Sequence, residues 1–174
     1  KEERIALLER LYEIYQRRMD EMAELISIEM GAPMDFSKAA QAPSGTNAIE
    51  DFLNQIKKFD FEFQLDDSDN QLIYEPKGVC ALITPWNWPI SQVALKVIPA
   101  IAAGCTMVLK PSEIAPLDSM LFADMLEEAG CPAGVFNLVN GDGAGVGSQL
   151  TSHPDIDMVS FTGSTRAGAL ISHN

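Results

Sequence analysis

The stretch that decides the fold is GVCALITPWNWPISQVALKVIPAIAAGCTMVLKPSE, residues 78–113. It contains a short apolar run at 79–83, a helical stretch at 91–103 that is apolar on nearly every side, and a second apolar run at 106–109. Short, fully apolar runs separated by helices are typical of parallel strands, because helices cover both faces of such a sheet. The stretch therefore predicts a β-α-β unit.

The same alternation continues downstream. Further strand-like runs lie at 135–139 and 158–161, and helical patterns lie at 117–129 and 145–151. Strands that alternate with helices favour a parallel sheet wound in both directions. We therefore predict an α/β fold with a doubly wound, mostly parallel, Rossmann-like sheet.

The region before residue 78 follows other patterns. Apolar residues at helical spacing predict one long helix over 4–30, ended by Gly31 and Pro33. A second helix is predicted over 39–58, with an interruption at Pro43, Ser44 and Gly45. These amino-terminal helices precede the repeating unit.

Between the helices and the sheet, the sequence predicts a β-hairpin. Residues 59–63 and 71–75 have the composition of short strands, and an acidic turn at 66–70 separates them. The hairpin lies outside the repeating unit, so we expect an arm that packs elsewhere. The predicted divisions are 1–58, 59–77 and 78–174. Both ends of the chain look cut, and we expect a longer protein.

The charge of the chain excludes several classes of partner. Asp and Glu number 25 against 12 Lys and Arg, for a net charge of −13, so attraction to nucleic acid or anionic lipid is not expected. No apolar run reaches the roughly 18 residues that cross a bilayer. We expect a cytoplasmic protein. Cys80, Cys105 and Cys131 lack the spacing of a zinc site or a disulfide framework, so no metal is predicted.

In an open parallel sheet, ligands bind outside the carboxyl ends of the strands, so the segments that follow the strands form the candidate site. The first segment is 84–89, where two prolines restrict the backbone around Asn87. Its amide either bonds its own backbone in a turn or serves as a fixed donor to a developing oxyanion. Such a donor is worth about 3 kcal/mol.

The second segment places Lys110, Ser112 and Glu113 directly after a strand. An ammonium can hold ribose or phosphate oxygens, and a carboxylate can accept hydrogen bonds from ribose hydroxyls. The alternative is a surface turn in which the serine caps a helix and the glutamate lies in its first turn.

Glycines dominate the other two segments. Residues 141–147 alternate glycine with other residues, which permits close approach of a ligand but also fits a flexible turn. Residues 160–168 combine a strand end, a glycine turn and a helix start, which together offer free N–H groups to an anion. Thr165 stands where the dinucleotide fingerprint has its second glycine, so an ordinary Rossmann binding mode is not predicted.

Lys96 is unusual because it lies within the strongly apolar helix. Its ammonium must either extend toward solvent or find a partner. If it is desolvated, its pKa falls and proton relay becomes feasible.

These segments share their order and spacing with one family. They resemble the aldehyde dehydrogenase superfamily at 78–80, 83–89, 95–96, 110–113 and 161–165. The amino-terminal helices are similar to those of the family, and the hairpin is similar to part of its oligomerisation arm. The resemblance implies that 78–174 is an incomplete NAD-binding domain, that the catalytic domain lies outside the chain, and that the full protein is a homodimer or homotetramer.

The resemblance also implies a reaction, in which an aldehyde is oxidised to a carboxylate through a cysteine thiohemiacetal, with NAD as hydride acceptor. Asn87 would stabilise the oxyanion and Lys96 would relay protons. Glu113 would repel a 2′-phosphate and favour NAD over NADP, a preference that Lys110 softens. The residues implied at the cofactor are Ile83, Thr84, Trp86, Lys110, Ser112, Glu113, Gly143, Gly147, Phe161, Gly163 and Ser164.

The nucleophile and the base are expected beyond Asn174, because the three cysteines do not match the family's nucleophile motif. We therefore expect weak dinucleotide binding at most, and no turnover, from this chain alone. Two alternatives stay open. One is an acylating, coenzyme A-dependent semialdehyde dehydrogenase; the other is a non-catalytic nucleotide-binding or structural protein with the same fold.

Overall fold

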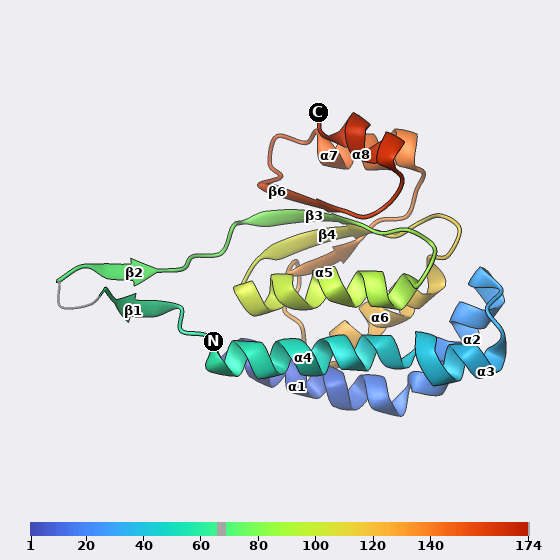
Figure 1. The fold of residues 1–174 in the computed structure, drawn as a ribbon, viewed down its shortest axis with the longest axis horizontal. Helices are drawn as coiled ribbons and strands as arrows, with labels where there is room; N and C mark the ends of the chain where they lie inside the picture. The colour runs from blue at the N-terminus through green and yellow to red at the C-terminus, as the bar shows by residue number, and fades with distance from the viewer. Residues whose placement is uncertain (66–68, 174) are drawn as a thin grey trace.

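A computed structural model describes residues 1–65 and 69–173. At its centre is a parallel sheet with the strand order β5-β4-β3-β6 (Figure 1). The strands are β3 (Val79–Ile83), β4 (Thr106–Lys110), β5 (Phe136–Leu138) and β6 (Met158–Phe161). The predicted α/β class is confirmed, and the predicted bounds of β3 and β6 are correct.

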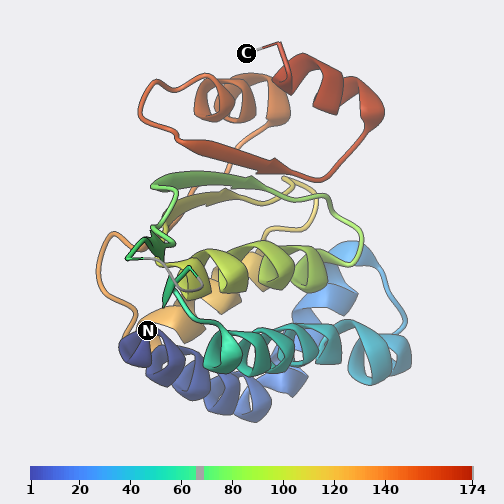
Figure 2. The same cartoon turned by 60° about the vertical axis from the view of Figure 1, so that its left-hand side comes forward.

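Helices cover both faces of this sheet (Figures 1 and 2). One face carries α5 (Pro89–Ala103) and α6 (Leu117–Glu128). The other carries the π-helical turn η2 (Gly143–Gly147) with α7 (Ser148–Thr151) and α8 (Thr165–Ile171). The chain runs outward from β3 through β4 to β5, then returns to add β6 on the other side of β3. This reversal creates a switch point between β3 and β6, where sheets of this kind form a ligand crevice.

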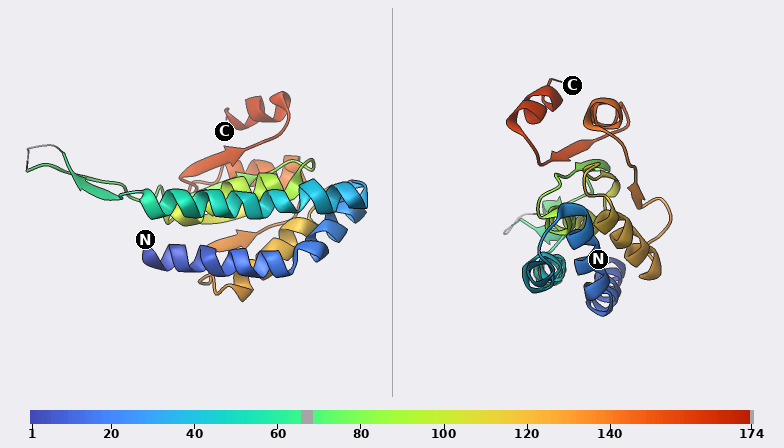
Figure 3. Two further views of the ribbon diagram at one scale, coloured as in Figure 1. Left: turned by 60° about the horizontal axis from the view of Figure 1, so that its bottom comes forward. Right: turned by 90° about the vertical axis from the view of Figure 1, so that its right-hand side faces the viewer.

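The amino-terminal helices form a second layer under α5 and α6 (Figures 1 and 3). They share one hydrophobic core with these helices, in which Tyr15 and Phe122 are the largest fully buried side chains. The Tyr15 hydroxyl donates to the Ala42 carbonyl at 2.8 Å, and its ring meets Phe122 edge-on at 6.2 Å. The layer consists of α1 (Glu2–Arg17), α2 (Met19–Met30), α3 (Met34–Phe36), η1 (Ser37–Gln41) and α4 (Pro43–Lys58).

Two arginines of α1 link the amino-terminal layer to the ends of α5 and α6. Arg4 donates to the carbonyl of Ala102 and Arg10 to that of Ala129, each at 2.7 Å. Both carbonyls lie at helix ends, where cations are favoured because the last carbonyls lack partners. The predicted division into 1–58, 59–77 and 78–174 stays a prediction.

Two details of the predicted helices are wrong. The long helix over 4–30 is two helices, because Arg18 leaves the helical conformation at φ −105° and ψ 15°. The second predicted helix is interrupted one residue earlier than predicted, because η1 ends at Gln41 and α4 begins after Ala42, with Ser44 and Gly45 inside it. Pro43 is the first residue of α4, where its missing N–H has no helical partner to lose. Gly45 lies inside α4 and leaves room for the Tyr15 ring, which an added Cβ would overlap.

The predicted hairpin is present as an antiparallel pair that projects from the body (Figures 1 and 3). Its strands are β1 (Glu62–Gln64) and β2 (Gln71–Ile73), shorter than predicted, with Phe63 opposite Leu72. The predicted turn at 66–70 lies partly outside the described residues. A two-stranded ribbon of this length is at best marginally stable alone.

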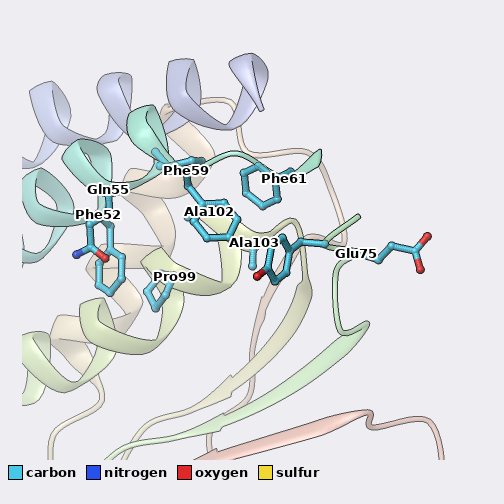
Figure 4. A pocket seen from close by; sticks show the side chains of 10 residues that line it. Phe52, Gln55, Phe59, Phe61, Glu75, Pro99, Ala102 and Ala103 are labelled. Atoms are coloured by element: carbon cyan, nitrogen blue, oxygen red, sulfur yellow. The ribbon is translucent and has the colours of Figure 1, made fainter. Parts of the chain in front are cut away.

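An aromatic cluster anchors the base of this arm. The Phe59 ring lies 4.8 Å from Phe61 and 5.2 Å from Tyr74, and the Arg4 guanidinium lies 4.4 Å over Phe61. With α4 and α5, the cluster lines an apolar groove of about 320 Å³ (Figure 4).

Asp118 is a buried carboxyl in the first turn of α6. Its side chain has no exposed surface, and within the described residues Oδ2 has no hydrogen-bond partner. Burial, followed by the nearby charge of Glu29, raises the pKa of Asp118 from 3.8 to about 7. The folded protein therefore favours the protonated form, and ionisation at higher pH costs stability.

We predict that Asp118→Asn stabilises the protein increasingly as the pH rises. In the unfolded chain Asp118 ionises near pH 4, whereas in the folded chain it keeps its proton up to about pH 7. Its contribution to stability is therefore complete below pH 4 and is lost between pH 4 and 7. Relative to the native protein, the variant should gain about 1.4 kcal/mol per pH unit inside that window.

Urea unfolding at pH 5 and pH 8 measures this gain. Asp124→Asn, at an exposed carboxylate of the same helix, is the matched control. A gain for Asp118→Asn that is the same at both pH values would contradict the prediction.

Candidate functional site

The carboxyl ends of three strands lie level with one another. Ile83 of β3 is paired with Lys110 of β4 on one side and with Phe161 of β6 on the other. One residue further on, the Thr84 N–H donates to the Lys110 carbonyl at 3.3 Å, and the Thr162 N–H donates to the Ile83 carbonyl at 3.1 Å. The segments that follow the three strands therefore begin side by side.

These segments enclose a cleft of about 540 Å³, which continues into a hollow of about 600 Å³ beside η2 and α8. The cleft and the hollow together form the crevice at the switch point. The two spaces share Ile83, Gly143, Phe161, Ser164 and Ala167. All of the predicted cofactor residues line one or both of them, and Asn87 lines the cleft. The predicted residues in the cleft are Ile83, Thr84, Trp86, Asn87, Lys110, Ser112, Glu113, Gly143, Phe161, Gly163 and Ser164, and Gly147 lines the hollow.

The backbone after Asn87 has an unusual conformation. Trp88 has φ 52°, the only positive φ of a non-glycine residue in the described chain, and it is the N-cap of α5. Its ring meets Phe36 edge-on at 5.6 Å, and Pro89 follows as the first helical residue. The Asn87 side chain is exposed and makes no hydrogen bond to the rest of the described residues. The structure therefore does not show the turn in which the Asn87 amide hydrogen-bonds its own backbone.

Lys110 and Glu113 form an ion pair on the wall of the cleft. Lys110 is 2 % exposed, and its Nζ donates to the Pro111 carbonyl at 2.8 Å and lies 3.5 Å from Glu113 Oε2. An ammonium has three donors, so one remains for another acceptor. The Glu113 side chain is 55 % exposed and can accept further hydrogen bonds. Neither Ser112 nor Glu113 caps a helix, because α6 begins only at Leu117.

The glycine-rich segment is an ordered turn. Asp142 caps it, because its carboxylate accepts from the Gly145 N–H at 2.8 Å and its carbonyl accepts from the Gly147 N–H at 3.0 Å. The helix predicted at 145–151 is thus a π-helical turn at 143–147 that continues into α7. Gly143 faces open space, since an added Cβ would meet no atom within 4 Å.

The turn between β6 and α8 is tightly packed. Ser164 is the N-cap of α8, and its Oγ accepts from the Ala167 N–H at 3.2 Å. Gly163 lies against the Phe161 ring, because an added Cβ would come within 2.5 Å of Cζ. The glycine is therefore needed for space, which allows the Phe161 ring to line the cleft.

Lys96 is the one predicted site residue that does not line the crevice. It lies on α5, half-buried, and its Nζ donates to Ser160 Oγ on β6 at 2.9 Å. Burial lowers the pKa of Lys96. The Lys96 ammonium therefore has a partner inside the protein and does not simply extend toward solvent.

Comparison with known proteins identifies the family. The model of the aldehyde dehydrogenase family matches residues 1–174. The chain belongs to this family. It is 52% identical to a 3-succinoylsemialdehyde-pyridine dehydrogenase from Pseudomonas sp, over 99% of this chain but 36% of that protein. The chain thus spans about a third of the length of its curated relatives.

Solved structures of the family share the fold. An aldehyde dehydrogenase from Bartonella henselae superposes with a TM-score of 0.97 at 56% identity, over 99% of this chain and 37% of that one. A mutant of aldehyde dehydrogenase C from Pseudomonas syringae, in complex with NAD+ and octanal, gives 0.94 at 48% identity, over 98% and 35%. A betaine aldehyde dehydrogenase from Staphylococcus aureus, in complex with NAD+, gives 0.93 at 33% identity, over 99% and 35%.

None of the three cysteines of this aldehyde dehydrogenase chain lines the crevice. Burial, followed by contact with Cys105, raises the pKa of Cys80 to about 11, and burial also raises that of Cys131. Neither thiol is suited to act as a thiolate nucleophile. Within residues 1–65 and 69–173, no cluster of metal-ligating side chains and no helix capable of crossing a membrane is found.

Sequence reasoning missed several residues of the crevice. Gln92 and Thr162 line the cleft, and Ser148 and Arg166 line the hollow. Gln92 lies in the first turn of α5, directly after the segment 84–89, and Arg166 lies in the first turn of α8, inside the segment 160–168 but not named there as a site residue. The first helical turn after each strand was therefore the signal that could have found these two residues.

We predict that Gly163→Ala destabilises the protein, whereas Gly143→Ala does not. The first change forces the Phe161 ring to move, which should cost about 1 kcal/mol or more. The second adds a methyl group to open space on the same crevice, so the cost should stay within about 0.5 kcal/mol. Thermal unfolding midpoints measure both. Equal midpoints for the two variants would show that the ring contact does not constrain the turn.

Proposed function

We propose that the whole protein is an NAD-dependent aldehyde dehydrogenase that converts an aldehyde to a carboxylate. The observation that carries this proposal is a single crevice at the switch point of the sheet. It brings together the Asn87 amide, the Lys110–Glu113 pair and the glycine turn at Gly163. The Pseudomonas syringae relative with NAD+ and octanal, and the Staphylococcus aureus relative with NAD+, support the assignment.

The shape and donors of the crevice fit a dinucleotide. Two connected spaces of about 540 and 600 Å³ suit the two halves of an elongated ligand. Glu113 would accept hydrogen bonds from ribose hydroxyls, and the third N–H of Lys110 would donate to a ribose or phosphate oxygen. When bound, NAD supplies the hydride acceptor. Ile83, Thr84, Trp86, Ser112, Gly143, Gly147, Phe161 and Ser164 would form the remaining walls.

Asn87 is the residue of this chain that we assign to the chemical step. Its exposed amide follows β3, and the left-handed Trp88 and Pro89 hold the backbone beside it. A fixed NH2 group in this position would stabilise the oxyanion that develops when a thiol adds to the aldehyde carbonyl. We propose that the thiol and the general base come from the part of the protein outside residues 1–174. Lys96, with its lowered pKa, would relay a proton behind the cleft.

The arm is proposed to join subunits into a homodimer or homotetramer. Phe63, Leu65 and Ile73 are exposed on it, and a two-stranded ribbon needs a further partner to be stable. The mass of the whole protein in solution distinguishes the two assemblies. The cytoplasmic location stays a prediction.

We predict that the whole protein forms NADH from octanal and that Asn87→Ala lowers kcat by about 10²- to 10³-fold. The affinity for NAD should change little, because the oxyanion contact exists only during the reaction. Asn54→Ala, at an exposed asparagine of α4, is the control and should retain full activity. Stopped-flow and steady-state NADH absorbance measure both. Failure to reduce NAD with any aldehyde would exclude the proposed activity.

We predict that Glu113→Gln narrows the preference for NAD over NADP roughly ten-fold. The change removes the carboxylate that would repel a 2′-phosphate and leaves the Lys110 charge without its partner. Calorimetric titration of the whole protein gives the dissociation constants of both dinucleotides. Glu50→Gln, at an exposed glutamate of α4, is the control. A preference unchanged in Glu113→Gln would place the ribose elsewhere in the crevice.

A further inference from the structure

We propose that Ser160 is a positioning residue for Lys96, whose hydroxyl oxygen fixes the ammonium beside the carboxyl end of β6. The functional consequence rests on the proposed role of Lys96 as a proton relay. The contact itself is independent of that role. It joins α5, which follows Asn87, to β6, which precedes Gly163.

The contact is long-range and specific. Lys96 Nζ lies 2.9 Å from Ser160 Oγ, and the two residues are 64 positions apart in the sequence. Ser160 is level with Leu82 of β3, which is buried in the core that α5 shares. The next residue, Phe161, packs against Gly163 and Gly168 beside α8. Successive strand residues point to opposite faces, so Ser160 points to the α5 face and Phe161 to the cleft side.

The surroundings leave the ammonium with few other partners. Val93 and Val97, on the same helix, are fully buried, and Lys96 itself is half-buried. Burial is the only cause that lowers the pKa of Lys96. Of the charged side chains on the neighbouring described elements, Asp118 of α6 and Asp157 beside β6 do not contribute to this shift. Ser160 is thus the side chain that directs the ammonium.

A serine hydroxyl suits this position. Its oxygen accepts from the ammonium while its own O–H stays available as a donor. A hydrogen bond to the charged form opposes the effect of desolvation and holds the pKa of the lysine higher than burial alone would. A lysine side chain without this acceptor has four rotatable bonds and would not keep one position. Ser160 therefore sets both the place and the proton affinity of the ammonium.

The test measures the pKa of Lys96 in native protein, Ser160→Ala and Ser160→Thr. Acetic anhydride acetylates only the unprotonated amine, so the extent of Lys96 acetylation against pH, read by peptide mass spectrometry, reports the pKa. Ser160→Ala should lower the midpoint by roughly half a unit or more, because the charged form loses its acceptor. Ser160→Thr keeps the oxygen on a residue suited to strands and should restore the midpoint.

Lys58, exposed at the end of α4, is the internal control and should react alike in all three proteins. A Lys96 midpoint that is the same in Ser160→Ala as in native protein would overturn the proposal. A midpoint that shifts in Ser160→Ala and returns in Ser160→Thr supports it.

The pH profile of NADH formation separates this inference from the proposed function. If Lys96 relays protons, the kcat profile of the whole protein should shift with the acetylation midpoint, while KM for NAD stays the same. A shifted acetylation midpoint with an unshifted kcat profile would confirm that Ser160 positions the ammonium and would remove Lys96 from the proposed reaction.

Discussion

The parallel register of β3 with its two neighbours is the constraint on which the candidate site depends. Ile83 is level with Lys110 and with Phe161, and backbone hydrogen bonds from Thr84 and Thr162 extend both ladders by one residue. A slip of one residue would turn each side chain to the opposite face of the sheet. The Lys110 side chain and the Phe161 ring would then leave the cleft together, so the crevice exists only in this register.

The amino ends of the same strands are clamped as well. The Asp157 carboxylate accepts from the Val79 N–H at 2.8 Å, and the Asp157 N–H donates to the Val79 carbonyl at 2.9 Å. Gly78 has φ +117°, and an added Cβ there would overlap the carboxylate. The start of β6 is thereby locked to the start of β3. Because β3 is also buried between helices on both faces, neither end can slide without breaking buried contacts.

The sequence predicted what depends on local patterns. The bounds of β3 and β6 were correct because their apolar runs end at residues that favour turns, and the crevice was predicted because parallel strands place their carboxyl ends together. The break at Arg18 was missed because the apolar spacing continues through it. The left-handed Trp88 and the Ser160 partner of Lys96 could not be predicted, since each depends on contacts between distant segments.

The proposed function requires a chain with a net charge of −13 to bind an anionic dinucleotide through local groups rather than through its overall electrostatic field. Interactions between exposed charges are largely screened beyond about 8 Å in physiological salt, so the contacts inside the crevice determine the affinity. The structure supplies one buried ammonium at Lys110 and an exposed guanidinium at Arg166, and it orders the glycine segment through the Asp142 cap. The ammonium is already paired with Glu113, so its attraction for phosphate is weakened. The proposed recognition would therefore depend on the fit of ribose hydroxyls to Glu113 and on backbone N–H groups, and both of these need the strand ends to stay level.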